Sequence, residues 1–232
     1  MSFIIAEIGV NWDGDFNLVE DMMIHAKNAD CNAVKFQAFN KNIIGNHPEY
    51  ERLMKTSISE SNIEKIDNLA QKIGIEWFCT PMYPEAIDFL TPYVKRFKIR
   101  EFDSRKLLEN KTTDLMEKIL ETDKEIIISS QNSPENSKLY NNSKIKWLYC
   151  VPKYPCNLED IDFSELEKFD GFSNHCPQLI APLSAAIRGA EIIEIHITSS
   201  KQKNFVDNNV SFDYNELTDT IKAIRLSEKI KT

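Results

Sequence analysis

The sequence has few glycines, no long apolar run and no excess of basic residues. Only six of its 232 residues are glycine, and neither G-x-G-x-x-G nor G-x-x-x-x-G-K-[ST] occurs, so the usual dinucleotide and P-loop signatures are missing. No stretch approaches the roughly 18 apolar residues that a membrane helix needs, so we expect no membrane partner. The 28 basic residues are outnumbered by 36 acidic ones, which argues against nucleic-acid binding but is compatible with a local pocket for one small anion.

Cysteine is scarce and forms no recognisable pattern. The five cysteines are odd in number and make no C-x-x-C pair, so neither a disulfide framework nor a zinc knuckle is indicated. The chain begins with Met1 and Ser2 and enters an apolar segment without a basic region or a cleavage site. We therefore expect a protein of the reducing cytoplasm.

Short apolar or β-branched runs alternate with segments of helical spacing eight times. Most of the runs are apolar almost throughout, which is typical of parallel strands that are covered on both faces. The expected strands are Phe3–Gly9, Ala33–Ala38, Ile75–Pro81, Arg96–Phe102, Glu125–Ser130, Ile145–Val151, Gly171–His175 and Glu191–Thr198. Eight such units in a chain of this length predict an α/β protein with a single-domain (β/α)8 (TIM) barrel over residues 1–232. The alternative is an open, doubly wound sheet, which usually has fewer strands.

The helical segments between these strands have apolar faces and recognisable ends. The segment Ser61–Gly74, for example, begins with a serine in the cap position and ends at a glycine. The expected helices are Asn17–Asp30, Ser61–Gly74, Pro84–Val94, Thr112–Thr122, Pro134–Asn141, Ser164–Phe169, Pro182–Ala190 and Tyr214–Ile230.

Polar residues stand at the end of each expected strand, where the catalytic groups of a barrel gather. A polar side chain inside a strand costs free energy unless it finds a partner, so the set predicts a site at one end of the barrel. Each residue alone has an alternative interpretation, in which it only satisfies a neighbouring loop. The set includes Glu7, Asn11, Lys35, Gln37, Thr80, Lys98, Arg100, Glu101, Asp103, Ser129, Tyr154, Ser173, Asn174, His175, Glu194 and His196.

Two histidines and two lysines in this set suggest particular chemistry. His175 and His196 lie on neighbouring strands and could bind one divalent metal ion, or they could be buried and hydrogen-bonded histidines. Lys35 and Lys98 could hold a phosphate or carboxylate, one of them could form a Schiff base, or either could be a structural ion-paired lysine. The acidic residues Glu7, Glu101 and Asp103 are then ion-pair partners or acid/base groups.

Several sequence strings in the same order resemble the N-acetylneuraminate (sialic acid) synthase family. The resemblance extends from Ile5 to about Arg225, and several strings together are more specific than any one of them. The strings are Ala6-Glu7-Ile8-Gly9-Val10-Asn11, Ala33-Val34-Lys35-Phe36-Gln37, Thr80-Pro81, Phe97-Lys98-Ile99, Tyr154-Pro155, Phe172-Ser173-Asn174-His175, Ile193-Glu194-Ile195-His196-Ile197-Thr198 and Asp207 before Ser211.

This resemblance implies a (β/α)8 barrel that condenses phosphoenolpyruvate with an N-acetylated aldose similar to N-acetylmannosamine. The products would be a nonulosonic (sialic-type) acid and phosphate. It further implies a divalent metal of the Mn2+ or Mg2+ class on His175 and His196. Phosphoenolpyruvate would meet Lys35, Lys98, Thr80, Ser129 and Ser173, and the sugar side would hold Glu7, Tyr154 and Asp207, with Gln37 among the substrate-binding residues. The catalytic groups would be Glu7, Lys98 and Asp103, the last of which stands where the family has a glutamate.

The sequence departs from the family pattern at several positions. Arg100-Glu101-Phe102-Asp103 replaces Ala-Ser-Gly-Glu, Asn174 replaces an aspartate, and Pro152 stands in place of an asparagine. The family also adds a small antifreeze-like domain, which we expect to be absent after Thr232, so that a homodimer or a separate antifreeze-like chain would complete the site. Two alternative functions follow. One is a catalytically impaired barrel that binds a sugar or anion or acts as a partner subunit, and the other is a related aldol-type enzyme for another aldehyde.

Overall fold

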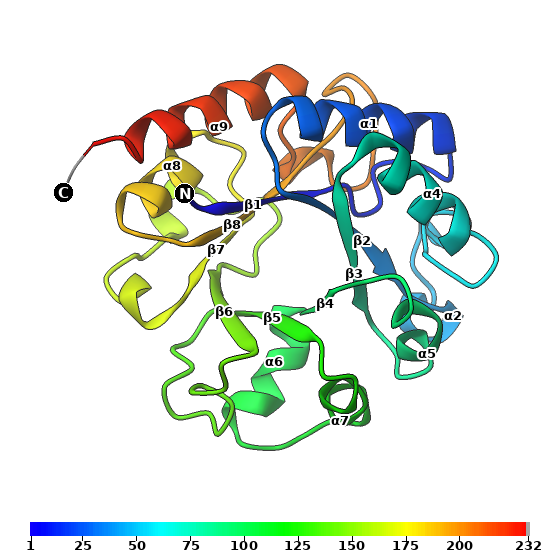
Figure 1. Cartoon of the computed structure of the whole chain (residues 1–232), viewed down its shortest axis with the longest axis horizontal. Coiled ribbons are helices and arrows are strands. Elements are labelled where there is room, and N and C mark those ends of the chain that lie inside the picture. The colour runs from blue at the N-terminus through cyan, green and yellow to red at the C-terminus, as the bar shows by residue number, and fades with distance from the viewer. Residues whose placement is uncertain (231–232) are drawn as a thin grey trace.

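Eight parallel strands close into a barrel in chain order, and β8 pairs with β1 to complete it (Figure 1). The computed structural model describes residues 1–230, so the last two residues of the expected domain lie outside the described part. The strands are β1 (Phe3–Glu7), β2 (Ala33–Ala38), β3 (Glu76–Pro81), β4 (Arg96–Ile99), β5 (Glu125–Ser130), β6 (Ile145–Cys150), β7 (Gly171–Asn174) and β8 (Ile192–His196). The predicted (β/α)8 fold is confirmed.

The apolar strands are buried because helices cover the outside of the barrel and side chains fill its interior. All five residues of β8 are buried, and so are the five residues Trp77–Pro81 of β3. The contact between β7 and β8 requires a glycine, since a Cβ atom on Gly171 would lie 1.9 Å from the carbonyl oxygen of Ile192. The register there pairs Gly171 with Ile192 and Phe172 with Ile193.

Nine α-helices occur in the described residues, and several have the ends that the sequence indicates. They are α1 (Phe16–Asn28), α2 (Lys41–Ile44), α3 (Tyr50–Met54), α4 (Ile63–Ile73), α5 (Ala86–Leu90), α6 (Glu101–Leu108), α7 (Asp114–Glu121), α8 (Ile180–Ile187) and α9 (Tyr214–Ser227). Asp213 and Glu216 form a capping box at the start of α9. Gly74 ends α4 with a φ of 74°, a conformation that glycine adopts at no steric cost.

Two expected helices were wrong, and one expected strand ends earlier than predicted. No helix forms over Pro134–Asn141, where the backbone makes only successive turns, such as Ser137 N to Pro134 O at 2.8 Å. The segment Ser164–Phe169 contains only a 3-10 turn at Leu166–Lys168. Pro134–Asn141 is rich in residues that favour turns over helix interiors, and Ser164–Phe169 spans fewer than two helical turns. The fourth strand ends at Ile99 instead of Phe102, because the chain turns at Arg100 and α6 begins at Glu101.

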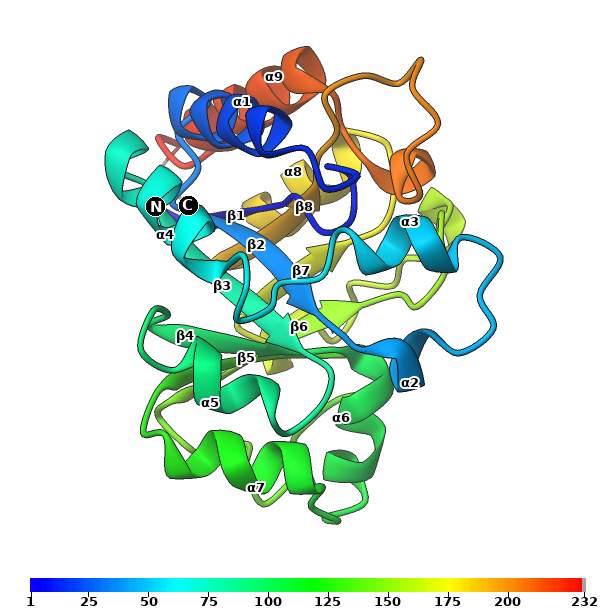
Figure 2. The same cartoon turned by 90° about the vertical axis from the view of Figure 1, so that its right-hand side faces the viewer.

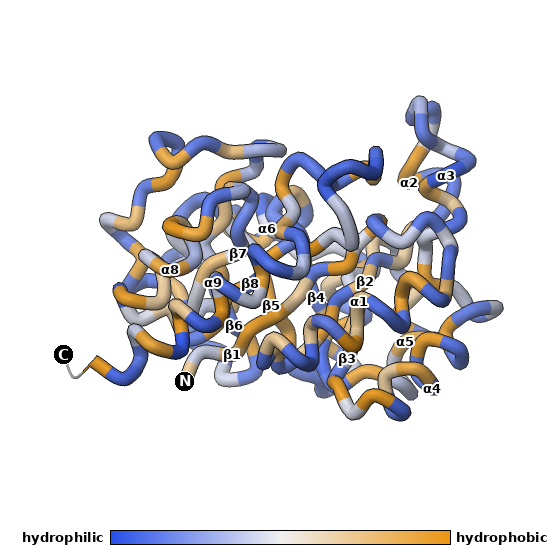
Figure 3. Tube along the Cα trace, turned by 90° about the horizontal axis from the view of Figure 1, so that it is seen from above, coloured by the Kyte–Doolittle hydropathy of each residue, from blue (hydrophilic) through white to orange (hydrophobic). Residues whose placement is uncertain are grey.

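The long connection between β2 and β3 adds two short helices that the sequence did not predict. Figures 2 and 3 place α2 and α3 beyond the carboxyl ends of the strands, on the side opposite both termini. The connection is anchored by a small apolar cluster, separate from the barrel core, around Val10, Phe39 and Leu53. Over the described residues, no helix has both the length and the apolar character needed to cross a bilayer.

Candidate active site

A cavity of about 370 Å3 opens at the carboxyl ends of the strands. It brings together eleven of the twelve residues to which the family resemblance gives a role, namely Glu7, Lys35, Gln37, Thr80, Lys98, Ser129, Tyr154, Ser173, His175, His196 and Asp207. Each β-strand places its last inward-facing residues here, because side chains alternate between the barrel interior and its outer face. The exception is Asp103, which does not line the cavity.

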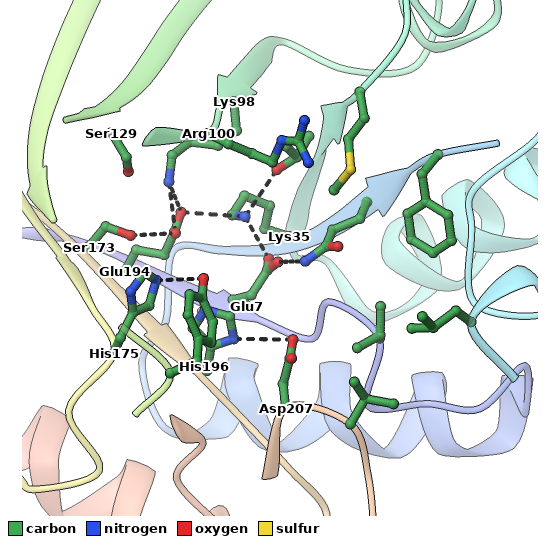
Figure 4. Close-up of a pocket in the computed structure, with 18 of the residues that line it drawn as sticks. Glu7, Lys35, Lys98, Arg100, Ser129, Ser173, His175, Glu194, His196 and Asp207 are labelled. Atoms are coloured by element: carbon green, nitrogen blue, oxygen red, sulfur yellow. Dashed lines mark hydrogen bonds and ion pairs between the residues drawn. The ribbon is translucent and has the colours of Figure 1, made fainter. Parts of the chain in front are cut away.

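Glu194 lies at the centre of an ion-pair network on the floor of the cavity (Figure 4). Both of its carboxylate oxygens are 2.7 Å from Lys98 Nζ, and Oε2 is 3.7 Å from Lys35 Nζ. Ser173 Oγ donates to Oε1 at 2.8 Å. We call Glu7, Lys35, Lys98 and Glu194 the charged floor; all four side chains are at most 5% exposed.

Lys35 connects the two carboxylates of the charged floor. Its Nζ lies 2.9 Å from Glu7 Oε2 and donates to Thr80 Oγ1 at 3.1 Å. Gln37 Nε2 donates to the other oxygen of Glu7 at 2.9 Å. The floor therefore pairs two lysines with two glutamates, and Thr80 and Gln37 satisfy further hydrogen bonds.

Burial and ion pairing shift the acidities of the charged floor in different directions. Burial opposes charge on Glu194, but Lys35 and Lys98 outweigh it and hold the pKa of this carboxyl well below its usual range. Burial lowers the pKa of Lys98, whereas at Lys35 the nearby carboxylates outweigh burial and raise the pKa. Burial raises the pKa of Glu7 even though Lys35 is adjacent. Glu194 is thus the firmly anionic member of the floor.

The two histidines predicted to bind metal lie edge to face, with ring centroids 5.4 Å apart and an angle of 66° between the ring planes. His175 Nδ1 donates to the carbonyl of Val151 at 2.7 Å, which leaves Nε2 as an acceptor 2.8 Å from the Tyr154 hydroxyl. Burial lowers the pKa of His175 to about 4 and lowers that of His196 well below its usual value, where His175 adds to the effect. Both imidazoles are therefore neutral near pH 7, which is the form that binds metal.

Asp207 approaches the same histidine from the loop after β8. Its Oδ2 lies 3.7 Å from His196 Nδ1, an atom that has no hydrogen-bond partner within residues 1–230. Burial, reinforced by the charge of Glu7, raises the pKa of Asp207 to about 7. Asn11 holds this loop in place, because its amide donates to Ile197 O and its Oδ1 accepts from the backbone N–H of Asp207.

The departures from the family pattern mostly lie outside the cavity lining. The Glu101 carboxylate is 2.8 Å from Arg105 on the next turn of α6, so it is turned away from the charged floor. The amide of Asn174 exchanges hydrogen bonds with the backbone of Cys176 and shapes the turn after β7. Pro152 also lies outside the lining. Asp103 pairs with Arg100, and Arg100 does line the cavity.

The outer part of the cavity has an apolar wall. We define this wall by uncharged side chains from the α2–α3 segment and from the loops after β1, β2, β3 and β8, namely Val10, Phe39, Ile44, Leu53, Met82 and Val206. The cavity therefore has a polar, charged end and an apolar end, as is typical of small-molecule sites.

One central residue received no role from the sequence. Glu194 was counted among the strand-end polar residues, and it shares a strand face with His196 because the two are separated by one residue. That signal predicts an inward direction for Glu194. Its pairing with Lys98 was not predictable, since β4 and β8 lie far apart in the chain.

Known proteins resemble this chain along almost its whole length. The NeuB family profile matches residues 22–232. The chain belongs to the NeuB family. Among its relatives, N,N'-diacetyllegionaminic acid synthase of Legionella pneumophila is 28% identical over 98% of this chain and 72% of its own length. Pseudaminic acid synthase of Helicobacter pylori is 27% identical over 97% of this chain and 74% of its own length.

A solved structure supports the same family membership. The N-acetylneuraminic acid (sialic acid) synthetase of Leptospira borgpetersenii, crystallised in complex with citrate, has a TM-score of 0.85 and 28% identity to this chain. The match covers 98% of this chain and 84% of that protein. The resemblance predicted from the sequence strings is confirmed at the level of the NeuB family and of the barrel.

Proposed function

We propose that this NeuB-family barrel condenses phosphoenolpyruvate with an N-acetylated aldose, giving a nonulosonic acid and phosphate. The observation that carries the proposal is the meeting of a lysine pair with two adjacent, neutral imidazoles in one cavity. Lys35 and Lys98 provide fixed positive charge, and His175 and His196 lie beside them. The named activities of the relatives, which are synthases of sialic-type acids, point to the same reaction class.

The lysine end of the cavity suits an enol phosphate. Lys35 and Lys98 would hold the phosphate and carboxylate through charge-assisted hydrogen bonds, with Thr80 and Ser173 beside them. Ser129 Oγ is buried and has no hydrogen-bond partner in the described part of the chain. A buried hydroxyl without a partner is costly, so a bound anion would satisfy it.

The imidazole pair suits a divalent ion of the Mn2+ or Mg2+ class. His196 Nδ1 is a buried nitrogen without a hydrogen-bond partner in the described residues, and His175 Nε2 is an acceptor. Within residues 1–230 no three His, Cys, Asp or Glu side chains gather as a metal centre, so His175 and His196 would hold the ion and leave positions for water or substrate oxygen. The ion would act as a Lewis acid toward the aldehyde oxygen.

The aldose would lie between the imidazoles and the apolar wall. Tyr154, Asp207 and Glu7 offer polar contacts to its hydroxyl groups. The methyl of an N-acetyl group would pack against the apolar wall, where Val10 and Leu53 offer no competing charge.

In this arrangement the methylene carbon of phosphoenolpyruvate attacks the aldehyde carbon and forms the new carbon–carbon bond. Burial raises the pKa of Asp207 to about 7, and this carboxyl beside His196 would exchange a proton with the aldehyde oxygen as that oxygen gains negative charge. The attack leaves a cationic carbon that still bears the phosphate oxygen, and water adds to this carbon. The C–O bond to phosphate then breaks with its electron pair on phosphate, and the added oxygen becomes the keto group. Of the two protons that this oxygen loses, one replaces the proton given to the aldehyde oxygen and the other leaves on phosphate. Lys35 and Lys98 stabilise the negative charge of phosphoenolpyruvate and of the departing phosphate.

Phosphate release tests this proposal. Protein is incubated with phosphoenolpyruvate, Mn2+ and each member of a panel of N-acetylated aldoses that includes N-acetylmannosamine. We expect release that requires both the aldose and the metal, stops with EDTA and is lost in Lys98→Ala. Release without any aldose, or none with the whole panel, would contradict the proposal. Phosphoenolpyruvate binding without any product would instead support the catalytically impaired barrel.

A further inference from the structure

We propose that Arg100 is an additional anion-binding residue of this site and that Asp103 positions it. The inference rests on the proposed function, because the anion concerned is phosphoenolpyruvate. Arg100 is two residues after Lys98, so both side chains point to the same side of the backbone and line the cavity. Figure 4 shows Arg100 on the same side of the cavity as Lys35 and Lys98.

The backbone fixes the base of the Arg100 side chain. β4 ends at Ile99 and α6 begins at Glu101, so Arg100 alone forms the connection. Its carbonyl accepts from the backbone N–H of Asp103 at 3.1 Å and of Ser104 at 3.0 Å, which ties it to the first turn of α6. The guanidinium therefore starts from a rigid position at the rim of the charged floor.

Asp103 occupies one edge of the guanidinium and leaves the other edge open. Arg100 Nε donates to Asp103 Oδ2 at 2.7 Å, and Nη2 donates to Oδ1 at 3.2 Å. A guanidinium has five N–H donors, and Nη1 has no hydrogen-bond partner among residues 1–230. The free edge, which includes Nη1, has the planar two-donor geometry that binds a carboxylate or phosphate.

The charge balance of the cavity favours this use of Arg100. Three cationic side chains and three carboxylates line the cavity, and both lysines are tied to Glu7 and Glu194 on the floor. Arg100 differs from them, because its carboxylate partner Asp103 lies outside the lining. A multiply charged enol phosphate needs cationic N–H donors that no carboxylate already occupies. Among the lining residues Arg100 meets this need.

Calorimetric titration with phosphoenolpyruvate in the presence of Mn2+ tests the inference. Arg100→Ala should weaken binding by about tenfold or more, the loss expected for one charge-assisted hydrogen bond. Arg100→Lys should recover only part of the affinity, because lysine keeps the charge but not the two-donor edge. Arg105→Ala is the matched control, since Arg105 lies on the same helix and pairs with Glu101 away from the cavity. Its affinity should be unchanged.

The role of Asp103 is tested by steady-state kinetics. A positioning residue predicts that Asp103→Asn raises KM for phosphoenolpyruvate while kcat is retained, and that the double variant Arg100→Ala/Asp103→Asn binds no worse than Arg100→Ala alone. A fall in kcat without a change in KM would overturn this role and make Asp103 an acid/base group.

The outcomes separate the inference from the proposed function. If the wild-type protein binds phosphoenolpyruvate and Arg100→Ala binds it equally well, the inference is wrong and the proposed function stands. If the wild-type protein does not bind phosphoenolpyruvate at all, the proposed function is itself wrong. Binding weakened in Arg100→Ala and preserved in Arg105→Ala supports the inference, and the phosphate-release assay then decides the proposed function.

Discussion

The ion pair between Lys98 and Glu194 is the interaction whose loss we expect to cost most stability. Lys98 Nζ contacts both carboxylate oxygens of Glu194 at 2.7 Å, and both side chains are nearly inaccessible. Breaking a buried pair by removing one charge costs about 3–5 kcal/mol, because the remaining charge stays buried without compensation. Glu194→Gln preserves the side-chain volume and the acceptor for Ser173, so it isolates the loss of charge.

The two partners should respond unequally to substitution. Glu194→Gln leaves Lys98 with no carboxylate partner and should cost about 3–5 kcal/mol of unfolding free energy. Lys98→Met leaves Glu194 with Lys35 and Ser173, so it should cost less, about 1–3 kcal/mol. The double variant should be more stable than Glu194→Gln alone. The measurement is urea denaturation in EDTA at pH 7.5, followed by circular dichroism.

A surface ion pair and the pH provide the controls. On the outside of the barrel, Lys72 Nζ lies 2.6 Å from Glu20 Oε1. Lys72→Met should lower the unfolding free energy by less than about 1 kcal/mol. The pKa of Glu194 is below its ordinary value of 4.5, so its stabilising contribution is present above pH 4.5 and is lost as the pH falls. The difference in unfolding free energy between the wild type and Glu194→Gln should therefore become smaller as the pH is lowered. A Glu194→Gln cost equal to that of Lys72→Met would refute the reasoning.

Two further substitutions test the metal site and the closure of the barrel. His196→Ala should abolish Mn2+ binding, followed by electron paramagnetic resonance, with an unchanged circular dichroism spectrum; unaltered metal affinity would show that the imidazole is not a ligand. Gly171→Ala should destabilise the barrel by about 3 kcal/mol or more, because the new Cβ would meet the backbone of Ile192 at 1.9 Å; an unfolding midpoint equal to wild type would show that the close approach of β7 and β8 is not required.

The strands were predictable because buried strands are rich in apolar residues, which can be recognised in the sequence. Parallel strands in a barrel are largely apolar on both faces, so β1 and β5 stand out as apolar runs, and β2 and β8 are apolar apart from the side chains that face the site. The end of β4 was not predictable in the same way. Arg100 and Phe102 continue the alternation of a strand, but the N–H groups of Asp103 and Ser104 bond to Arg100 O and start a helix.

The site was predictable as far as strand topology determines it. Neighbouring parallel strands end at the same rim, so His175 and His196 were expected to meet, and they do. Interactions across the barrel leave no such pattern, because Lys98 and Glu194 are 96 residues apart. The position of Asp103 outside the cavity was also not predictable, because this residue lies in the first turn of α6 and not in a strand.

A crystal structure with Mn2+ and phosphoenolpyruvate tests the central claim most directly. We expect one anomalous Mn2+ peak held by His175 and His196 and an enol phosphate bound by Lys35 and Lys98 in the same cavity. His175 still hydrogen-bonded to the Tyr154 hydroxyl with no metal beside it, or phosphoenolpyruvate bound away from the two lysines, would contradict it.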